Sequence, residues 1–317
     1  MSDPPAPRSA RMGWWGRVLL LVALLVIGLL GIALYTEFRM ADSGDLSALG
    51  DGEGIYLIVG SDSRANVPPD LGSFGDFPGE RADVIMLAQV ASGRRQLLSI
   101  PRDLKVEVPG EGTEKINAAY SFGGPNLIAE TVAQATGIRA NHYLEIDFAG
   151  FAAIVDALGG IELDFPFPAR DLNSGLLVEV AGTHTINGAA ALAYARSRQY
   201  EELRDGEWVG ESVAGDIART GRQRQVLLQI LGKTASPTGL ARSPLVMLAA
   251  ASHLKSDADT SVFDLAELGW GMATSSETDS ATLPVQISNE GGVSYVIPVP
   301  PASEVLAAFQ NRQPLPA

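Results

Sequence analysis

The sequence predicts an α/β domain whose central sheet is covered by helices on both faces, behind one N-terminal transmembrane helix. The first observation is that apolar runs of strand length alternate with amphipathic helical segments from Gly54 onward. The second is that 46% of the 317 residues are apolar and 19% are charged, which is enough to build a large core. No Pro/Ser-rich linker interrupts residues 54–317, so we expect them to form one domain.

The N-terminal anchor is predicted from Val18–Thr36, which contains no charged residue over 19 positions. At about 1.5 Å per residue this run would span roughly 28 Å, the hydrocarbon thickness of a bilayer. The preceding tail, residues 1–17, carries three arginines, which places it in the cytoplasm and the rest of the chain outside. A cleaved signal peptide is the alternative, but it would have a shorter apolar core. Residues 37–53 are expected to be a polar tether.

Strands and helices can be assigned along the domain from periodicity and turn signals. Strands are predicted at 55–59, 81–90, 96–101, 142–146, 161–165, 282–287 and 293–298. Helices are predicted at 125–136, 148–158, 187–196, 216–231, 241–254, 262–272 and 302–310. Pro125 suits a first helical turn and Gly137 suits a C-terminal cap, whereas Asp147 and Asn187 are residues that cap helix N-termini.

Composition excludes several functional classes. The chain has no cysteine, so disulfides, thiolate metal sites and thiol catalysis are absent. The three histidines, His142, His184 and His253, lie in unrelated contexts. A net charge of -14 argues against nucleic-acid binding.

Two aspartates flank the ends of consecutive strands. Asp62 follows the first strand and Asp83 begins the second, so both carboxylates reach one rim if the strands are neighbours. Two carboxylates with water suit an Mg²⁺ ion that also binds phosphate oxygens. Either aspartate alone could be an ordinary turn residue, but the pair lies beside Arg64 and Arg81, which favours a site.

Further basic residues occur at element ends. Arg102 ends the third strand, where Pro101 stops it and Asp103 can hold the guanidinium. Arg196 and Arg198 end the helix that begins at Asn187, where a favourable interaction with the helix C-terminus is the simpler explanation. Lys115 precedes the helix at Pro125, whose N-terminus adds partial positive charge.

The helix at 216–231 has one face that is polar for two turns and apolar beyond. The polar part comprises Asp216, Arg219, Arg222 and Gln223, and the apolar part Val226, Leu227 and Ile230. A plain amphipathic helix would carry an apolar stripe throughout. A solvated helix end is one interpretation, and an arginine-lined site beside an apolar one is the other. Arginines bind phosphate oxygens bidentately, so the residues together indicate phosphoryl chemistry at the loop ends of a sheet.

The chain resembles the LytR-CpsA-Psr family of cell-envelope glycopolymer ligases. The matching runs, in order over about 54–231, are GSDSR, RADVIML, SIPRD, KINAAYSFGG, DFAGFAAIVDALGGIEL, INGAAALAYARSR and DIARTGRQRQVL. The resemblance implies a mixed sheet between helices and an apolar tunnel for a polyprenyl chain. It also implies Mg²⁺-dependent transfer of a polyprenyl-pyrophosphate-linked glycopolymer to a peptidoglycan hydroxyl through a phosphodiester.

The resemblance also implies residue roles. Asp62 and Asp83 would hold the metal, although Asp83 could instead be the base for the acceptor hydroxyl, and Arg102 and Arg219 would act with it in catalysis. The expected pyrophosphate-binding residues are Arg64, Arg81, Lys115, Arg196, Arg198, Arg222 and Gln223. The expected tunnel residues are Phe148, Phe151, Val155, Val226 and Ile230, for each of which ordinary core packing is the alternative.

Two positions depart from the family pattern, because Ala82 and Val84 stand where Ser and Thr are usual. A non-enzymatic polyprenyl-phosphate-binding protein or attenuator and a pyrophosphate hydrolase are the competing functions. The identity of the glycopolymer is left open.

Overall fold

The centre of the computed structural model is a seven-stranded mixed sheet in the order β1-β14-β7-β2-β3-β4-β15. The structure describes residues 28, 31–37, 39–52, 54–62, 80–91, 94–211, 215–275 and 277–316. The strands, in sheet order, are Ala41–Asp42, Leu254–Ser256, His142–Asp147, Ile55–Ser61, Ala82–Ala91, Arg94–Ser99 and Glu277–Thr282. β2 pairs with β7 in parallel and with β3 in antiparallel orientation, which confirms the expected mixed α/β architecture.

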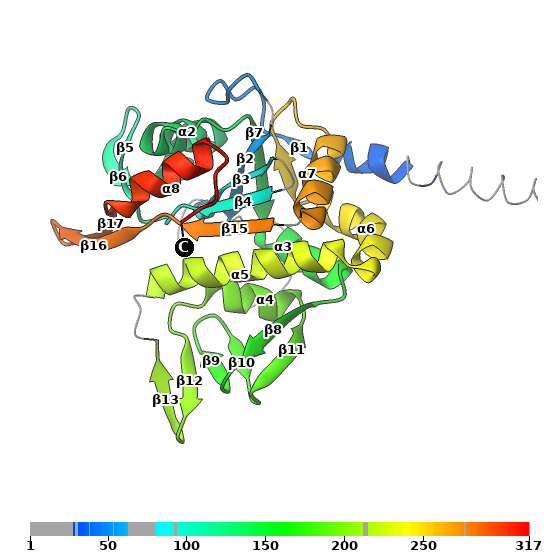
Figure 1. Cartoon of the computed structure of the whole chain (residues 1–317), viewed down its shortest axis with the longest axis vertical. Helices are drawn as coiled ribbons and strands as arrows, with labels where there is room; N and C mark the ends of the chain where they lie inside the picture. Colours follow the sequence, from blue (N-terminus) through cyan, green and yellow to red (C-terminus); the bar gives the residue numbers. More distant parts are fainter. Residues whose placement is uncertain are drawn as a thin grey trace, which may run out of the picture.

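Helices cover both faces of this sheet (Figure 1). On one face, α2 (Ala118–Thr136) and α8 (Pro301–Gln310) pack in a core that contains Leu57, Val59 and Phe309. On the other, α5 (Gly215–Ala235) and α7 (Val262–Thr274) pack against residues such as Met86. Helix α3 (Phe148–Ala157) follows β7 directly, and α6 (Pro237–Ala250) packs against α3 and α5.

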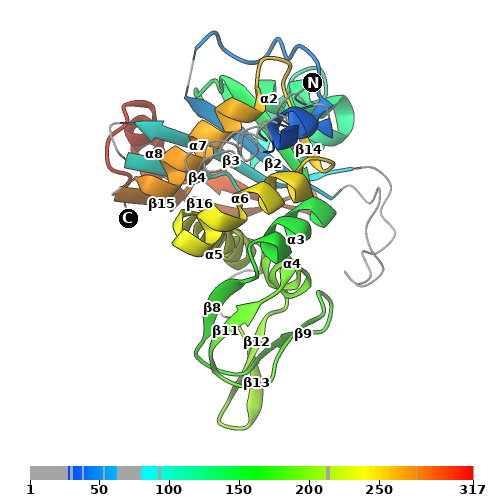
Figure 2. The same cartoon turned by 90° about the vertical axis from the view of Figure 1, so that its right-hand side faces the viewer.

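A smaller lobe of short strands projects beyond α3, α5 and the short helix α4 (Gly188–Arg196) (Figure 2). It contains β8 (Ile161–Phe165), β9 (Ala169–Asp171), β10 (Leu176–Val178), β11 (Gly182–Ile186), β12 (Glu201–Arg204) and β13 (Glu207–Gly210). Helix α4 returns the chain from the lobe, and both share one apolar cluster with α5. Of these strands, only the one at 161–165 is predicted by the sequence. Two further hairpins are β5 (Lys105–Val108) with β6 (Gly112–Lys115), and β16 (Val285–Glu290) with β17 (Val293–Pro298).

Several element boundaries differ from the prediction. Helix α2 starts earlier than expected, at Ala118, but non-helical dihedrals at Gly123 and Gly124 (φ +62) divide it, so that its second segment begins at Pro125 as predicted. The strand expected at 282–287 is two strands, β15 and β16, since Pro284 cannot donate to a ladder. The helix expected at 241–254 ends at Ala250, and Leu254 begins β14. The expected caps are present, with Asp147 accepting from the Gly150 amide and Asn187 from that of Ala190.

The N-terminal predictions fall largely outside the described part of the chain. The tail 1–17 and most of the expected anchor 18–36 lie outside the described residues. Among the residues that are described, no helix combines the length and apolarity needed to cross a bilayer. The segment expected to be a tether, 37–53, contributes β1, and its Leu46 and Ala48 are buried in the main core. This segment therefore packs onto the domain.

The strands β2 and β3 alternate between the two faces of the sheet, and one irregularity interrupts the pattern. Residues Ile85 and Leu87 face α2, whereas Val84 and Met86 face the opposite side. The β2–β3 register shifts between Gly60 and Ser61, where Ser61 pairs with Ala82 and leaves Asp83 as the extra residue. This bulge gives the side chains of Asp83 and Val84 access to the same cavity.

Candidate functional site

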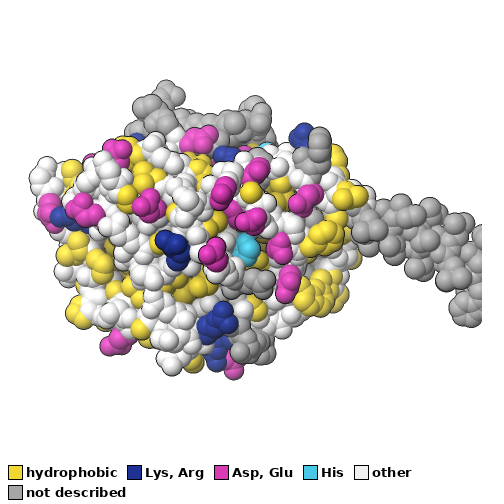
Figure 3. Space-filling view, turned by 90° about the horizontal axis from the view of Figure 1, so that it is seen from above, with side chains coloured by type: hydrophobic (Ala, Val, Ile, Leu, Met, Phe, Trp, Pro, Cys, Tyr) yellow, Lys and Arg dark blue, Asp and Glu magenta, His cyan; other side chains and the backbone are white. Residues whose placement is uncertain are grey.

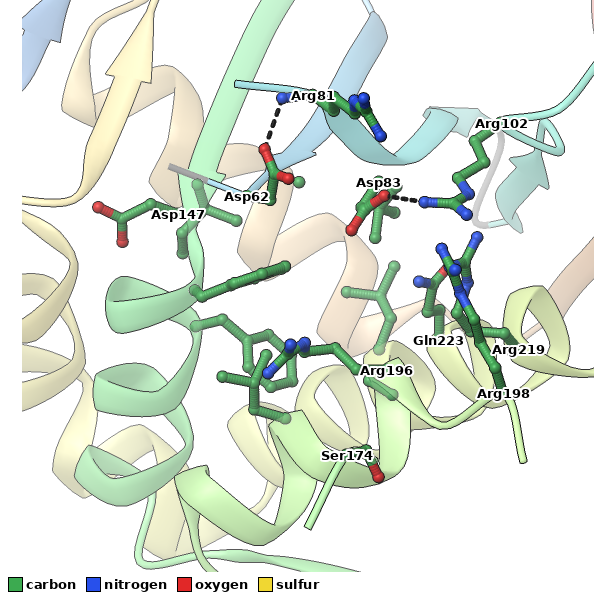
Figure 4. A pocket seen from close by; sticks show the side chains of 18 of the residues that line it. Asp62, Arg81, Asp83, Arg102, Asp147, Ser174, Arg196, Arg198, Arg219 and Gln223 are labelled. Carbon is green, nitrogen blue, oxygen red and sulfur yellow. Dashed lines mark hydrogen bonds and ion pairs between the residues drawn. The ribbon is translucent and has the colours of Figure 1, made fainter. Parts of the chain in front are cut away.

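A cavity of about 510 Å³ lies between the sheet and helices α3, α4 and α5 (Figure 4). The predicted residues that line it are Asp62, Arg81, Asp83, Arg102, Phe148, Phe151, Arg196, Arg198, Arg219 and Gln223. They come from segments separated by more than 150 positions. The structure therefore brings most of the predicted site residues to one place.

The two aspartates enter the cavity from neighbouring strands, as expected. Two hydrogen bonds connect Asp62 with Arg81. The Asp62 amide donates to the Arg81 carbonyl (3.0 Å), and the Arg81 amide donates to Asp62 Oδ1 (2.5 Å). Asp83 forms an ion pair with Arg102. Both carboxylates are only partly exposed, so the protein holds their orientations before a ligand binds.

Arg102 lies between two carboxylates. Besides its pair with Asp83, its Nε lies 3.6 Å from Asp103 Oδ2. Asp103 Oδ1 in turn forms an ion pair with Lys115 Nζ at 2.8 Å. Lys115 does not line the cavity, so its expected contact with the ligand is not provided by this arrangement. Its ammonium group instead helps to fix Asp103, whose position behind Arg102 agrees with the sequence-based expectation.

Helix α5 divides the predicted polar face into two stripes. Arg219, Gln223 and Leu227, spaced four residues apart, line the cavity. The neighbouring stripe, Arg222, Val226 and Ile230, does not. The two stripes diverge because the cavity and the apolar cluster of the lobe lie on adjacent sides of the helix. The side chain of Asp216 is outside the described residues.

Arg222 has a structural role that the sequence did not reveal. Its guanidinium is buried and binds both oxygens of Glu211 (2.7 and 2.6 Å) and the Ser197 carbonyl (2.5 Å). It also lies over the Tyr200 ring at 5.2 Å. The expectation that Arg222 binds pyrophosphate is therefore not supported by its position, because its charge is already neutralised within the protein.

The apolar wall of the cavity faces the arginines. Arg196 lies over the Phe148 ring, 5.1 Å from its centroid, and Phe151 follows one turn later on α3. The remaining aliphatic lining residues are Ile58, Val84, Met86, Ile146, Leu192, Ala195 and Leu227. Val155, Val226 and Ile230, which we expected in a tunnel, pack in the cluster that joins the lobe to α5. These three side chains point away from the cavity, so they are ordinary core residues and not tunnel residues.

Asp171 is a residue of the site that sequence reasoning missed. Its Oδ2 accepts from Ser197 Oγ (2.6 Å) and from the amides of Arg198 and Gln199 (both 2.9 Å). Its Oδ1 accepts from the amides of Asn173 (2.8 Å) and Ser174 (3.2 Å). One carboxylate therefore ties the β9–β10 turn to the segment that carries Arg198. The DLNSG run around it is a typical turn sequence, which could have indicated the turn but not this partner.

Hydrogen bonding also sets the charge of Asp171. Burial acts to raise the pKa of this carboxyl group, but the hydrogen bonds from Ser197 and from the amides of Gln199, Ser174 and Asn173 outweigh burial and lower the pKa below its usual value. The group is therefore ionised at neutral pH. The other polar side chains that line the cavity but were not predicted as site residues are those of Asp147, Asn173, Ser174 and Gln199. Arg64 lies outside the described residues.

The two departures from the family pattern have different surroundings. Ala82 is fully buried in the core beneath α2, whereas Val84 lines the cavity. A Cβ at Gly60 would lie 2.9 Å from that of Val84, so the cross-strand neighbour must be small. Val84 thus adds apolar surface to the cavity that Asp62 and Asp83 also line.

The carboxylates of the cavity can be compared with the coordination that a magnesium ion requires. Within the described ranges, no three carboxylate, histidine or cysteine side chains cluster as a metal site. Mg²⁺ usually binds one or two protein carboxylates and completes its coordination with water and phosphate oxygens. Asp62 and Asp83 fit that pattern, but only with a phosphate-bearing ligand to supply further oxygens.

The fold and cavity together define an α/β protein whose site is suited to a ligand with an anionic head and an apolar tail. A model of the LytR-CpsA-Psr family (LytR_cpsA_psr) matches residues 41–311, and the chain belongs to this family.

Relatives and solved structures agree with this membership. The chain is 41% identical over 187 residues to the "Probable cell wall biosynthesis protein LcpB" of Corynebacterium glutamicum, covering 57% of this chain and 42% of that protein. It is 31% identical over 204 residues to a teichoic acid transferase, TagU, of Halalkalibacterium halodurans, covering 63% and 60%. The chain thus spans about half the length of these curated relatives. The structure of a LytR-Csp2A-Psr enzyme from Actinomyces oris superposes with a TM-score of 0.68 at 30% identity, covering 86% of this chain and 96% of that one.

Proposed function

We propose that this protein is a membrane-anchored phosphotransferase that attaches a polyprenyl-pyrophosphate-linked glycopolymer to a peptidoglycan hydroxyl through a phosphodiester. The observation that carries the proposal is the joining of arginines and apolar walls in one cavity. Arg81, Arg102 and Arg219 line the same space as Phe151 and Met86. Support also comes from a relative of similar sequence that is named a polyisoprenyl-teichoic acid–peptidoglycan teichoic acid transferase.

The substrate would be held at both ends of its reactive region. The guanidinium groups would bind the pyrophosphate oxygens, and the first isoprenoid units would lie along the aliphatic and aromatic wall. Burial of an isoprenoid chain contributes about 0.8 kcal/mol per CH₂ before ordering costs. Affinity would therefore come mainly from the lipid, whereas the arginines would fix the phosphorus that reacts.

The reaction requires one bond to form and one to break. The acceptor oxygen bonds to the phosphorus that carries the glycopolymer, and the bridging P–O bond breaks, so that polyprenyl monophosphate leaves. The oxygen of Asp83 that is not paired with Arg102 would accept the hydroxyl proton. Arg102 and Arg219 would stabilise the charge that develops on the leaving phosphate. With Asp83 as the base, Asp62 would hold the magnesium ion together with phosphate oxygens of the substrate, and bound magnesium would supply neutralisation of the pyrophosphate charge.

The direct test is turnover by the full chain with a polyprenyl-pyrophosphate-linked saccharide and a peptidoglycan acceptor. We expect a phosphodiester-linked product by mass spectrometry, loss of product on chelation of magnesium, and its recovery when magnesium is restored. Arg102→Ala should remove most of the turnover. Arg224→Ala is the matched control, because Arg224 is on α5 but does not line the cavity.

Other results would point to other functions. Full activity of Arg102→Ala would contradict the assigned site. Lipid that co-purifies without any turnover would identify a binding protein instead. Release of phosphate or saccharide into water, with no acceptor product, would identify a hydrolase.

A further inference from the structure

Helix α7 has an unusual outer face for a surface helix. Its inner stripe, which includes Leu265 and Leu268, packs against the sheet with Met272. Its outer stripe should then be polar, but Phe263 and Trp270 lie there and are 62% and 58% exposed. Such large aromatic side chains on an outer face indicate a surface that meets something apolar.

Helix α6 continues this apolar surface. Leu240, Leu245 and Leu248 are all exposed on it, and Leu245 is 56% exposed. The two helices are neighbours on the right-hand side of the molecule in Figure 1, and they face the viewer in Figure 2. In the space-filling view, hydrophobic side chains gather at that same right-hand end (Figure 3). The exposed charged side chains on these helices are Arg242 and Glu267, which are of opposite sign.

The path of the chain indicates what covers this surface. Residues 31–37 are helical and lie beside α6 and α7 in both cartoon views. Leu34 and Tyr35 within them are 67% and 49% exposed. They end the apolar run Val18–Thr36, so the expected anchor reaches the domain at this end.

We propose that the outer faces of α6 and α7 rest on the phospholipid bilayer beside the anchor, with Trp270, Phe263 and Leu245 in the interfacial layer. Trp and Tyr are enriched at membrane interfaces, and exposed aliphatic side chains add apolar area that the interface can bury. This contact would fix the orientation of the domain over the membrane instead of leaving it free to rotate about the anchor. The inference is independent of the transfer reaction.

The absence of cysteine makes single-site labelling of the full chain straightforward. Leu245→Cys and Trp270→Cys would each carry an environment-sensitive fluorophore, and Ala307→Cys on α8 is the control. Ala307 is exposed on a helix on the other side of the molecule from α6 (Figure 1). Each labelled chain would be placed in nanodiscs of phosphatidylglycerol and phosphatidylcholine and compared with the same chain in detergent.

In nanodiscs we expect quenching by aqueous iodide to be several-fold weaker at positions 245 and 270 than at 307. Quenching by a lipid with a nitroxide near its headgroup should be stronger at 245 and 270. Equal iodide quenching at all three positions would overturn the proposal. Shielding at 245 and 270 that persists in detergent together with a doubled mass would also overturn it, because a second copy would then cover the face. A chain that stays out of the discs would contradict both the anchor and this contact, whereas transfer activity is measured separately.

Discussion

Two neighbouring stripes of α5 begin in the same way and serve different purposes. Each starts with a nearly buried arginine and continues to aliphatic residues: Arg219 leads to Leu227, and Arg222 leads to Val226. The first stripe lines the cavity, whereas the second lies in the cluster that joins the lobe to the helix. The difference is set by partners from elsewhere in the chain, since Glu211 neutralises the charge of Arg222 and the Ser197 carbonyl accepts a hydrogen bond from it. A single helix thus carries a structural cation and a site cation one turn apart.

The largest expected effect on stability is at Arg222. Arg222→Ala would leave Glu211 without its bidentate partner and the Ser197 carbonyl without its donor. Loss of a hydrogen bond from a charged donor to a buried acceptor such as the Ser197 carbonyl typically costs about 1.5–3 kcal/mol of unfolding free energy, and the pair with the partly exposed Glu211 adds less than a fully buried pair would. Urea denaturation should show this loss, and the molecules that remain folded should still bind the lipid substrate. A variant that unfolds normally but fails to bind substrate would contradict the structural role.

The reciprocal change is Arg219→Ala. Loss of one preorganised charge-stabilising group typically lowers kcat by about 100-fold to 1,000-fold. We expect a fall of that order in glycopolymer transfer, with a smaller loss of unfolding free energy than in Arg222→Ala. Single-turnover kinetics would separate the chemical step from binding. If Arg219→Ala retained the turnover of the Arg224→Ala control, the distinction between the two stripes would fail.

A third change concerns the support of the site at Asp171. Asp171→Asn keeps the shape of the side chain but removes its charge, which weakens the four hydrogen bonds from backbone amides and the one from Ser197. A hydrogen bond to a charged group typically contributes about 1.5–3 kcal/mol to the unfolding free energy. Because the folded pKa is depressed, the stabilisation is present above the unfolded value of about 3.9 and is lost as pH falls through the folded pKa. Denaturation of both proteins should therefore show a stability gap at pH 7 that narrows below about pH 4. A gap independent of pH would contradict the role of the charge.

The smallest effects should come from two adjacent aliphatic residues. Val226→Ala removes packed methyl groups and should lower the unfolding free energy by about 2 kcal/mol, with little change in lipid affinity. Leu227→Ala, on the cavity side, should do the reverse and weaken binding of polyprenyl phosphate more than it lowers stability. Scanning calorimetry would measure the stability of both variants, and titration calorimetry would measure their affinity for polyprenyl phosphate. Equal losses of stability and equal losses of affinity in the two variants would show that the two stripes of α5 do not differ in role.

Local sequence signals were sufficient to predict the residues at the rim of the site. Asp62 and Arg102 stand where apolar runs stop, so the ends of strands could be located and their convergence inferred from the α/β pattern. The sheet, its helices and the caps at Asp147 and Asn187 follow from the same periodicity and turn chemistry.

Contacts between distant segments explain what sequence reasoning missed. Asp171 and Arg222 both hold the segment around Ser197, but their partners lie on different elements, and short lobe strands carry little periodic signal. Val155 and Val226 share helical faces with cavity residues in the sequence, yet the helices turn them into the packed cluster. Residue type and spacing give the face of a helix, but the boundary between cavity and core on that face depends on tertiary packing.

The central claim is that one cavity holds both the pyrophosphate and the lipid. Photocrosslinking of the full chain with a polyprenyl pyrophosphate that carries a diazirine in its first isoprenoid units tests this most directly. Labelled peptides should contain Leu227, Phe151 or Met86, and excess inorganic pyrophosphate should reduce the labelling of all of them. Labelling confined to the lobe, or labelling of the cavity wall that pyrophosphate leaves unchanged, would contradict the claim.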